Sequence, residues 1–234
     1  MVVPPRRLTG VLDAMADTAI FDVDGTLVDT NYQHALAWFR AFDRFDIVLP
    51  VWRIHRAIGM GGDQLVPSLT SDEVEREHGE ALRAAWTEEF EPMIDEVRPF
   101  DGAHDLLVAV KERGFQVVLA SSGKSDHVER FLDLVDARDL ADAWTTSDDV
   151  EASKPAPDLV QTALDRVPGS RGVMIGDSPW DAVAAARADI PTIAVRTGGF
   201  APEELQDAGA VRVFDSLRAL IAGLDHTPLA RADA

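Results

Sequence analysis

The sequence of 234 residues contains no cysteine and a single tyrosine. Without cysteine the chain has no disulfide framework, no thiolate nucleophile and no cysteine-ligated metal. No apolar run approaches the ~20 residues that a membrane-spanning helix needs, so we expect no membrane partner. The N-terminal segment contains prolines and arginines but lacks the continuous apolar stretch typical of a signal peptide. We therefore expect a cytoplasmic protein.

Basic residues are also scarce. The chain has 22 of them against 41 acidic residues, which gives a formal net charge of −19. A surface of this sign repels nucleic acid, so we expect no nucleic-acid partner. Small anions are not excluded, because salt screens charges beyond ~8 Å and a few local cations outweigh a distant acidic surface. The length allows one sizeable core and a second, small module.

From residue 99 onward, strand-like and helix-like segments alternate. The run FQVVLA is apolar throughout, as expected of a strand that is covered on both faces. A repeating β–α pattern predicts an α/β fold with a doubly wound parallel sheet. The predicted strands are 18–21, 115–120, 143–145, 172–176, 192–195 and 211–214, and the predicted helices are 101–113, 126–135, 158–167 and 179–188.

The interval 32–98 lacks strand-like runs and has helical patterns throughout. Thr70 and Glu73 predict a capping box at the start of a helix. A helical insertion after the first strand predicts a cap over the carboxyl edge of the sheet, where ligands bind in such folds. We expect an N-terminal extension (1–17), an α/β core (18–31 and 99–234) and a helical cap (32–98). The residues that recur at helical spacing after Thr70 are Val74, His78, Ala81, Leu82, Ala85 and Trp86.

The segment FDVDGTLVDT places Asp22, Asp24 and Asp29 directly after the first predicted strand. Gly25 allows a sharp turn, which would leave Asp22 and Asp24 at the ligand-binding edge. Neighbouring carboxylates repel each other, so they require a hard cation such as Mg²⁺, which also neutralises a phosphate. The alternative is an acidic turn without chemical function.

Two later segments carry polar residues after strands or before helices. ASSGKS (120–125) is not a nucleotide P-loop, because Val118 stands where that motif needs glycine. Small polar residues in such a place are often only a connecting loop. Lys124 could contact a more distant anionic group of a substrate, or be only an exposed lysine beside a helix start, which we favour. In ASKPAPD (152–158), Lys154 precedes prolines that fix its backbone. An immobilised ammonium suits both a phosphoryl oxygen and repelling carboxylates.

The segment VMIGDSPWD (173–181) ends an apolar strand at Asp177, and Asp181 follows at the start of a helix. Aspartate is common at helix starts for structural reasons alone, so Asp177 is weak evidence by itself. Two other patterns are not sites. IGMGGDQL departs from GxGxxG at Gln64, and the six histidines show no zinc-binding spacing.

In this order, the four segments resemble the signatures of the haloacid dehalogenase superfamily of phosphohydrolases. The resemblance is to the members with a helical cap after the first motif, such as phosphoglycolate phosphatase and beta-phosphoglucomutase. It implies a Mg²⁺-dependent phosphatase that hydrolyses a small phosphorylated metabolite through an aspartyl-phosphate. We expect a monomer or a weak homodimer.

The resemblance also implies roles for individual residues. Asp22 would attack phosphorus, and Asp24 would act first as acid and then as base. Mg²⁺ would be held by the carboxylates of Asp22 and Asp177 and by the main-chain carbonyl of Asp24, with Asp181 and Ser178 supporting these ligands. Ser121 and Lys154 would act on the transferring phosphoryl group, and Thr26 would orient Asp24. The expected substrate-binding residues are Thr26, His34, Ser121, Ser122, Gly123 and Lys154.

Other activities fit the residues less well. A metal-independent dehalogenase needs no acid at position 24, and a phosphonate-cleaving relative would use a lysine in the cap, where 32–98 contains none. A binding protein without activity would not need to keep the catalytic residues of these segments, and in this chain none of those positions is altered. The cap residues that could be specificity contacts, or only core or hinge, are His34, Trp38, Trp52, Arg53, Arg56 and Met60.

A sugar-phosphate mutase is the main alternative. His34 occupies the position where beta-phosphoglucomutase keeps a histidine that acts on its acid–base residue. A mutase also needs a cation for a distal phosphate. The stretch Gly59-Met60-Gly61-Gly62 has none where the family places an arginine, although Arg53 and Arg56 precede it. We therefore expect net hydrolysis.

Overall fold

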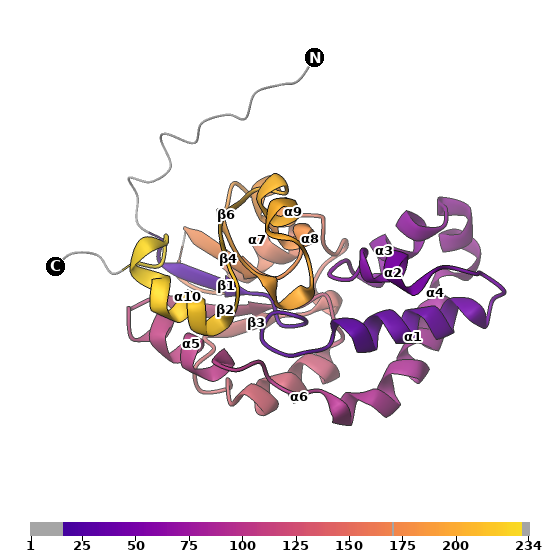
Figure 1. Ribbon diagram of the computed structural model, residues 1–234, viewed down its shortest axis with the longest axis horizontal. Helices are drawn as coiled ribbons and strands as arrows, with labels where there is room; N and C mark the ends of the chain where they lie inside the picture. The colour runs from indigo at the N-terminus through magenta and orange to yellow at the C-terminus, as the bar shows by residue number, and fades with distance from the viewer. Residues whose placement is uncertain (1–15, 170, 231–234) are drawn as a thin grey trace, which may run out of the picture.

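A computed structural model describes residues 16–169 and 171–230 of the chain. Its centre is a six-stranded parallel sheet with the strand order β3-β2-β1-β4-β5-β6 (Figure 1). This confirms the predicted doubly wound α/β fold. Most of the extension predicted for residues 1–17 lies outside the described residues. The strands are β1 (Thr18–Phe21), β2 (Gln116–Ala120), β3 (Ala143–Thr145), β4 (Gly172–Gly176), β5 (Thr192–Val195) and β6 (Ala210–Phe214).

Both faces of the sheet are buried. Successive side chains of each strand point to opposite faces, so neighbouring residues of one strand belong to different cores. Phe21 belongs to a core with helices α5 (Ala103–Lys111), α6 (Ser125–Val135) and α10 (Leu217–Gly223). Ile20 belongs to a second core with α7 (Asp158–Asp165) and α8 (Pro179–Arg187). Beyond β5, α9 (Pro202–Asp207) packs on β6. The apolar strand runs in the sequence thus reflect a sheet covered on both sides.

Between β1 and α5 the chain forms only helical elements, here called the helical segment (31–96). It stands at one end of the sheet in Figure 1. Trp38 and Trp86 stack at a ring-centroid distance of 5.7 Å and join two of its helices. One continuous buried cluster runs from this segment into the sheet, and the domain boundaries at residues 32 and 98 stay predictions. The elements are α1 (Asn31–Asp43), α2 (Val51–His55), α3 (Gly62–Leu69), α4 (Asp72–Phe90) and η1 (Glu91–Glu96).

The start of α4 differs from the predicted capping box. Ser71 is the N-cap and accepts a hydrogen bond from the Val74 backbone N–H at 3.3 Å. The Thr70 hydroxyl instead donates to the Val66 carbonyl at 2.6 Å, at the end of the preceding helix. The helix starts one residue later than predicted, and two of the residues predicted at helical spacing, His78 and Ala81, are exposed. None of the helices in the described part of the chain could cross a bilayer.

Candidate active site

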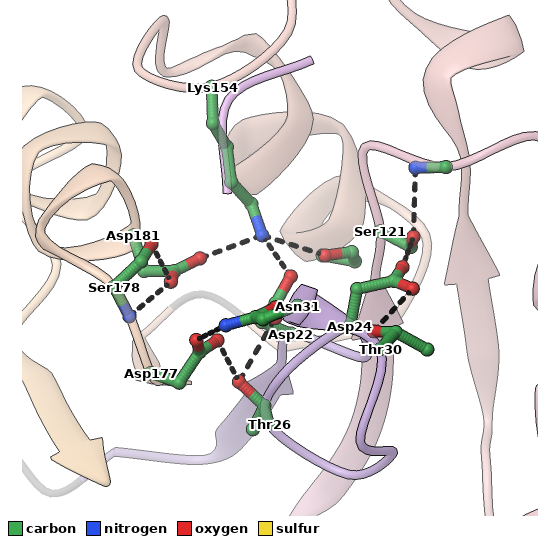
Figure 2. A network of polar contacts seen from close by, with 12 residues as sticks. Asp22, Asp24, Thr26, Thr30, Asn31, Ser121, Lys154, Asp177, Ser178 and Asp181 are labelled. Atoms are coloured by element: carbon green, nitrogen blue, oxygen red, sulfur yellow. Dashed lines mark hydrogen bonds and ion pairs between the residues drawn. The ribbon is translucent and has the colours of Figure 1, made fainter. Parts of the chain in front are cut away.

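The four predicted segments meet at the carboxyl ends of β1, β2 and β4, which are neighbours in the sheet (Figure 2). Asp22, Ser121 and Asp177 each follow directly after one of these strands. The parallel register pairs Phe21 with both Leu119 and Ile175, so the residues that follow emerge side by side. A sequence pattern spread over 160 positions thereby becomes one cluster.

Lys154 lies at the centre of this cluster and is fully buried. Its Nζ lies 2.5 Å from Oδ1 of Asp22 and 2.8 Å from Oδ1 of Asp181. It also donates to the carbonyl of Ala120 at 3.1 Å. A lysine ammonium has three N–H donors, and all three find an acceptor here. Lys154 is thus occupied by protein atoms rather than directed into open space.

The pKa values of Lys154 and Asp22 are both raised, but for different reasons. Burial would lower the pKa of Lys154, but the charges of Asp181 and Asp22 outweigh it and raise that pKa above its usual range. Burial raises the pKa of Asp22 well above its ordinary value, although the charge of Lys154 opposes the shift. Lys154 therefore stays charged, and its charge favours the carboxylate form of Asp22 against the effect of burial.

The carboxylates outnumber the cation. Oxygens of Asp22, Asp177 and Asp181 all lie within 4.8 Å of one another. Burial, followed by the charge of Asp181, raises the pKa of Asp177 to about 7. The raised pKa values mean that, without a further cation, protons compete for the carboxylates of Asp22 and Asp177, and a hard divalent cation with oxygen ligands would replace those protons. The residues present fit such an ion.

Asp181 is less available as a ligand than the other two carboxylates. One of its oxygens pairs with Lys154, and the other accepts from the Ser178 backbone N–H at 3.1 Å and from its hydroxyl at 2.6 Å. These bonds form a capping box at the start of α8. Asp22 and Asp177 are the carboxylates left to hold a cation. The main-chain carbonyl of Asp24 stays a predicted ligand.

The carboxylate of Asp24 accepts hydrogen bonds on both oxygens. Thr30 donates to Oδ1 at 3.1 Å and Ser121 to Oδ2 at 2.9 Å, while Nε2 of His34 lies 2.9 Å from Oδ1. Burial would raise the pKa of Asp24, but the hydrogen bonds and the charge of His34 outweigh it and lower the pKa. Asp24 is thus held as a carboxylate.

Thr26 lies elsewhere than predicted. Its hydroxyl is 3.0 Å from Oδ2 of Asp22 and 2.9 Å from Oδ1 of Asp177, and it makes no contact with Asp24. The residue is fully buried and does not reach the substrate space. The cause is the turn at Gly25, whose φ of +79° folds the chain so that Thr26 points back under the carboxylates. Thr30 takes the place beside Asp24 that we predicted for Thr26.

Asn31 is a site residue that the sequence did not single out. Its Nδ2 donates to Oδ2 of Asp177 at 2.8 Å from the first turn of α1. The side chain is buried, and it fixes the oxygen that Thr26 leaves free. The sequence gives little indication of this role, because Asn31 is only a single asparagine that follows DVDGTLVDT at the start of a helix. Asp29, the third aspartate of that segment, is exposed.

A cavity of about 150 Å³ opens beside these groups. Asp22 and Asp24 line it, as do three of the predicted substrate-binding residues, His34, Ser122 and Gly123. Within the part of the chain described, three other predicted substrate-binding residues, Thr26, Ser121 and Lys154, do not line it. The helical segment contributes Trp38, Met60, Arg83 and Trp86 to the wall.

The remaining cap candidates lie away from the cavity. Trp52 and Arg53 are exposed on α2. Arg56 pairs with Glu204 and lies over the ring of Phe200, so it joins the helical segment to the core. The helical segment does place a cation on the cavity wall. It is Arg83 of α4, which is not among the residues predicted from the sequence.

The chain is similar in sequence to known proteins. A family model of haloacid dehalogenase-like hydrolases matches residues 16–189. A phosphoglycolate phosphatase of Caulobacter vibrioides is 30% identical over 212 residues, which cover 87% of this chain and 89% of the relative. A validoxylamine A 7'-phosphate phosphatase of Streptomyces hygroscopicus subsp. limoneus is 30% identical over 190 residues, 78% of this chain and 87% of the relative.

A solved structure agrees as well. The crystal structure of a hydrolase from Pseudomonas syringae superposes with a TM-score of 0.84 at 33% sequence identity. The match covers 89% of this chain and 98% of that one. The family model spans the strand ends that carry Asp22 and Asp177. The chain belongs to the haloacid dehalogenase-like hydrolases.

Proposed function

We propose that the chain is a Mg²⁺-dependent phosphatase that hydrolyses a small phosphate monoester through an aspartyl-phosphate formed on Asp22. The observation that carries the proposal is the pair of carboxylates on the cavity wall. Asp22 is paired with a buried ammonium, whereas Asp24 is held by neutral donors and His34. Two carboxylates in such different surroundings suit two different roles. The two relatives at 30% identity, both named as phosphatases, support the same activity.

In the first step, a carboxylate oxygen of Asp22 bonds to phosphorus while the bond from phosphorus to the ester oxygen breaks. The leaving oxygen takes a proton from Asp24 as it departs. Asp24 must therefore be protonated when the substrate binds, against its lowered pKa. His34, whose Nε2 lies 2.9 Å from Oδ1 of Asp24, is the neighbouring group that can pass a proton to this carboxylate.

In the second step, Asp24 takes a proton from a water molecule. The water oxygen bonds to phosphorus while the bond between phosphorus and Asp22 breaks. Phosphate leaves, Asp22 is again a carboxylate, and Asp24 again carries its proton. Ser121 and Thr30 hold the Asp24 carboxylate in place through both steps.

A bound divalent cation neutralises charge on the phosphoryl oxygens and on the carboxylates that face them. Asp22 and Asp177 would hold it, and Thr26 and Asn31 orient the Asp177 oxygens. Magnesium suits this set because every available ligand atom is an oxygen. Lys154 compensates the remaining charge on Asp22 and Asp181. A cytoplasmic location and a monomer or weak homodimer stay predictions from the sequence.

A sugar-phosphate mutase is the second candidate, and two observations favour it. His34 contacts Asp24 directly, and Arg83 supplies the cavity with a cation that the turn at residues 59–62 lacks. A mutase would return the phosphoryl group to the same sugar instead of to water. We place hydrolysis first because both relatives at 30% identity are named as phosphatases.

Phosphate release tests the proposal. The purified protein is incubated with a panel of small phosphate monoesters and Mg²⁺, and free phosphate and remaining substrate are measured. We expect phosphate to appear one for one with substrate loss, and to stop on addition of EDTA. Isomerised sugar phosphate without free phosphate would show a mutase, and no turnover of any monoester would contradict both candidates.

A further inference from the structure

Among the residues that the structure describes, a lysine and an arginine line the cavity, and the lysine is not Lys154. Lys124 comes from the core, at the loop before α6, and Arg83 comes from α4 in the helical segment. Lys154 is occupied by Asp22 and Asp181. A phosphate monoester needs no cation on the opposite wall for cleavage at Asp22. The role of Arg83 therefore requires its own explanation.

Arg83 is held in one orientation by a neighbour on its own helix. Its Nη1 donates to Oε1 of Glu75 at 2.7 Å and to Oε2 at 3.0 Å. The same nitrogen lies 3.5 Å from the carbonyl of Gly62. Nε and Nη2 donate to no residue that the structure describes. One edge of the guanidinium is thus fixed, and the other keeps N–H donors free for a ligand.

Trp86 lies beside Arg83 on the cavity wall. It comes one helical turn after Arg83 and also lines the cavity, with only 9% of its surface exposed. Its indole Nε1 is buried, so we take the contribution of Trp86 to the cavity wall to be the apolar surface of its ring. Trp38 stacks on Trp86 and fixes its ring.

The free groups of Arg83 are N–H donors, so their ligand must present acceptor oxygens. A guanidinium with two free N–H groups matches a carboxylate or a phosphate, whose oxygens can accept two parallel hydrogen bonds. The cavity of about 150 Å³ is smaller than the ~300–1,000 Å³ of pockets for drug-sized ligands, so the whole substrate is compact.

We propose that Arg83, beside the apolar ring of Trp86, forms a subsite that binds a second anionic group of the substrate, a carboxylate or a second phosphate. This inference rests on the proposed phosphatase activity, because the first anionic group is the phosphoryl group at Asp22. The substrate class is then a compact phosphate monoester with a further acidic group. Arg83 determines which monoesters are used and takes no part in bond cleavage.

Matched substrate pairs test the subsite. One pair is 2-phosphoglycolate and ethyl phosphate, which differ in a carboxylate; the other is 1,3-propanediol bisphosphate and propyl phosphate, which differ in a phosphate. kcat/KM is measured for the wild type, Arg83→Gln, Arg83→Lys and Arg76→Gln. Arg76 is the control because it is an exposed arginine on the same helix, with no contact to the cavity. The pair with the larger difference identifies the second group.

We expect the wild type to prefer the member with the second anionic group. Arg83→Gln should lower kcat/KM for that member by about tenfold or more, the loss of a charge-assisted hydrogen bond, and leave the other member within about twofold. Arg83→Lys should recover part of the loss, and Arg76→Gln should change neither member. An equal loss for both members, or no loss, would overturn the subsite.

A binding measurement separates this inference from the proposed function. Phosphonoacetate and ethylphosphonate resemble the first pair but cannot be hydrolysed, and calorimetry measures their affinity in the presence of Mg²⁺. If no monoester is hydrolysed, the phosphatase proposal fails. The subsite still stands if phosphonoacetate binds more tightly than ethylphosphonate and Arg83→Gln removes the difference. It falls if the two ligands bind equally.

Discussion

The ammonium of Lys154 lies 2.5 Å from Oδ1 of Asp22, and both side chains are buried. The pair joins the loop after β1 to the loop before α7, 132 positions apart in the sequence. It accounts for the buried aspartate that follows β1 directly. The charge of Asp22 is compensated by a cation from a distant segment, and a bound metal ion would compensate it further.

Replacement of Lys154 should destabilise the protein. Lys154→Met removes the charge but keeps much of the volume, and leaves Asp22 and Asp181 buried without their partner. We expect the free energy of unfolding to fall by ~3–5 kcal/mol in denaturant titrations without metal. Lys111→Met is the control, because Lys111 pairs with Asp142 at the surface and should cost less than ~1 kcal/mol. Equal losses in the two variants would contradict the central role of Lys154.

Asp24→Asn should separate acid–base chemistry from metal binding. Asparagine keeps the shape of the side chain but cannot exchange the proton. The rate of phosphate release should fall by at least ~10²–10⁴-fold, while the Mg²⁺ affinity measured by calorimetry stays close to that of the wild type. A normal rate combined with weakened Mg²⁺ binding would mean that Asp24 is a ligand rather than the acid and base.

Asn31→Ala should weaken Mg²⁺ binding. The variant loses the 2.8 Å hydrogen bond that orients Oδ2 of Asp177. Residues that orient metal ligands typically contribute about 10–100-fold to affinity, and the Mg²⁺ concentration for half-maximal activity should rise within that range. Asp29→Ala serves as control, because this neighbouring carboxylate is exposed and should have no effect. An unchanged Mg²⁺ requirement in Asn31→Ala would contradict the role of Asn31 in orienting a metal ligand.

The stabilisation by Mg²⁺ should increase with pH. The pKa of Asp177 is about 7 in the folded protein against an ordinary 3.8, so between these values the folded state binds more protons than the unfolded state. The free energy of unfolding of the metal-free protein should therefore fall as pH rises through this window. Mg²⁺ binds the ionised form and should raise the Tm more at about pH 8 than at about pH 5.

The quantity to compare is the difference between the Tm with and without Mg²⁺. Other titrating groups, such as His55, whose pKa is lowered by burial, change the Tm with pH in both samples, so their effect cancels in this difference. In Asp177→Asn the Mg²⁺-dependent increase should be small at both pH values. A Tm increase in the wild type that does not depend on pH would argue against Asp177 as the titrating ligand.

Much of the α/β fold could be predicted from local sequence. β3, β4 and β5 begin and end where predicted, because short apolar runs bounded by polar residues leave little freedom in register. Helix α4 was less predictable at its start, where Ser71 and Thr70 are both good capping residues and only the preceding helix decides between them.

The site residues that follow strands could be predicted because strand ends in a parallel sheet meet at one edge. Asp22, Ser121 and Asp177 belong to this group. Thr26 and Arg83 could not be placed in this way. The partners of Thr26 depend on the backbone turn at Gly25, and Arg83 reaches the cavity only through the packing of α4 against α1.

Detection of phosphate on Asp22 tests the central claim most directly. The variant Asp24→Asn is used because it can still be phosphorylated by a reactive ester but returns the phosphoryl group to water slowly. It is incubated with a reactive phosphate ester that the wild type hydrolyses, and the reaction is quenched in acid. Borohydride then reduces an aspartyl-phosphate to homoserine, which peptide mass spectrometry locates. We predict homoserine at position 22, and none when Asp22 is also replaced by asparagine. Modification at another residue, or an unmodified Asp22 in a variant that still turns over, would contradict the account.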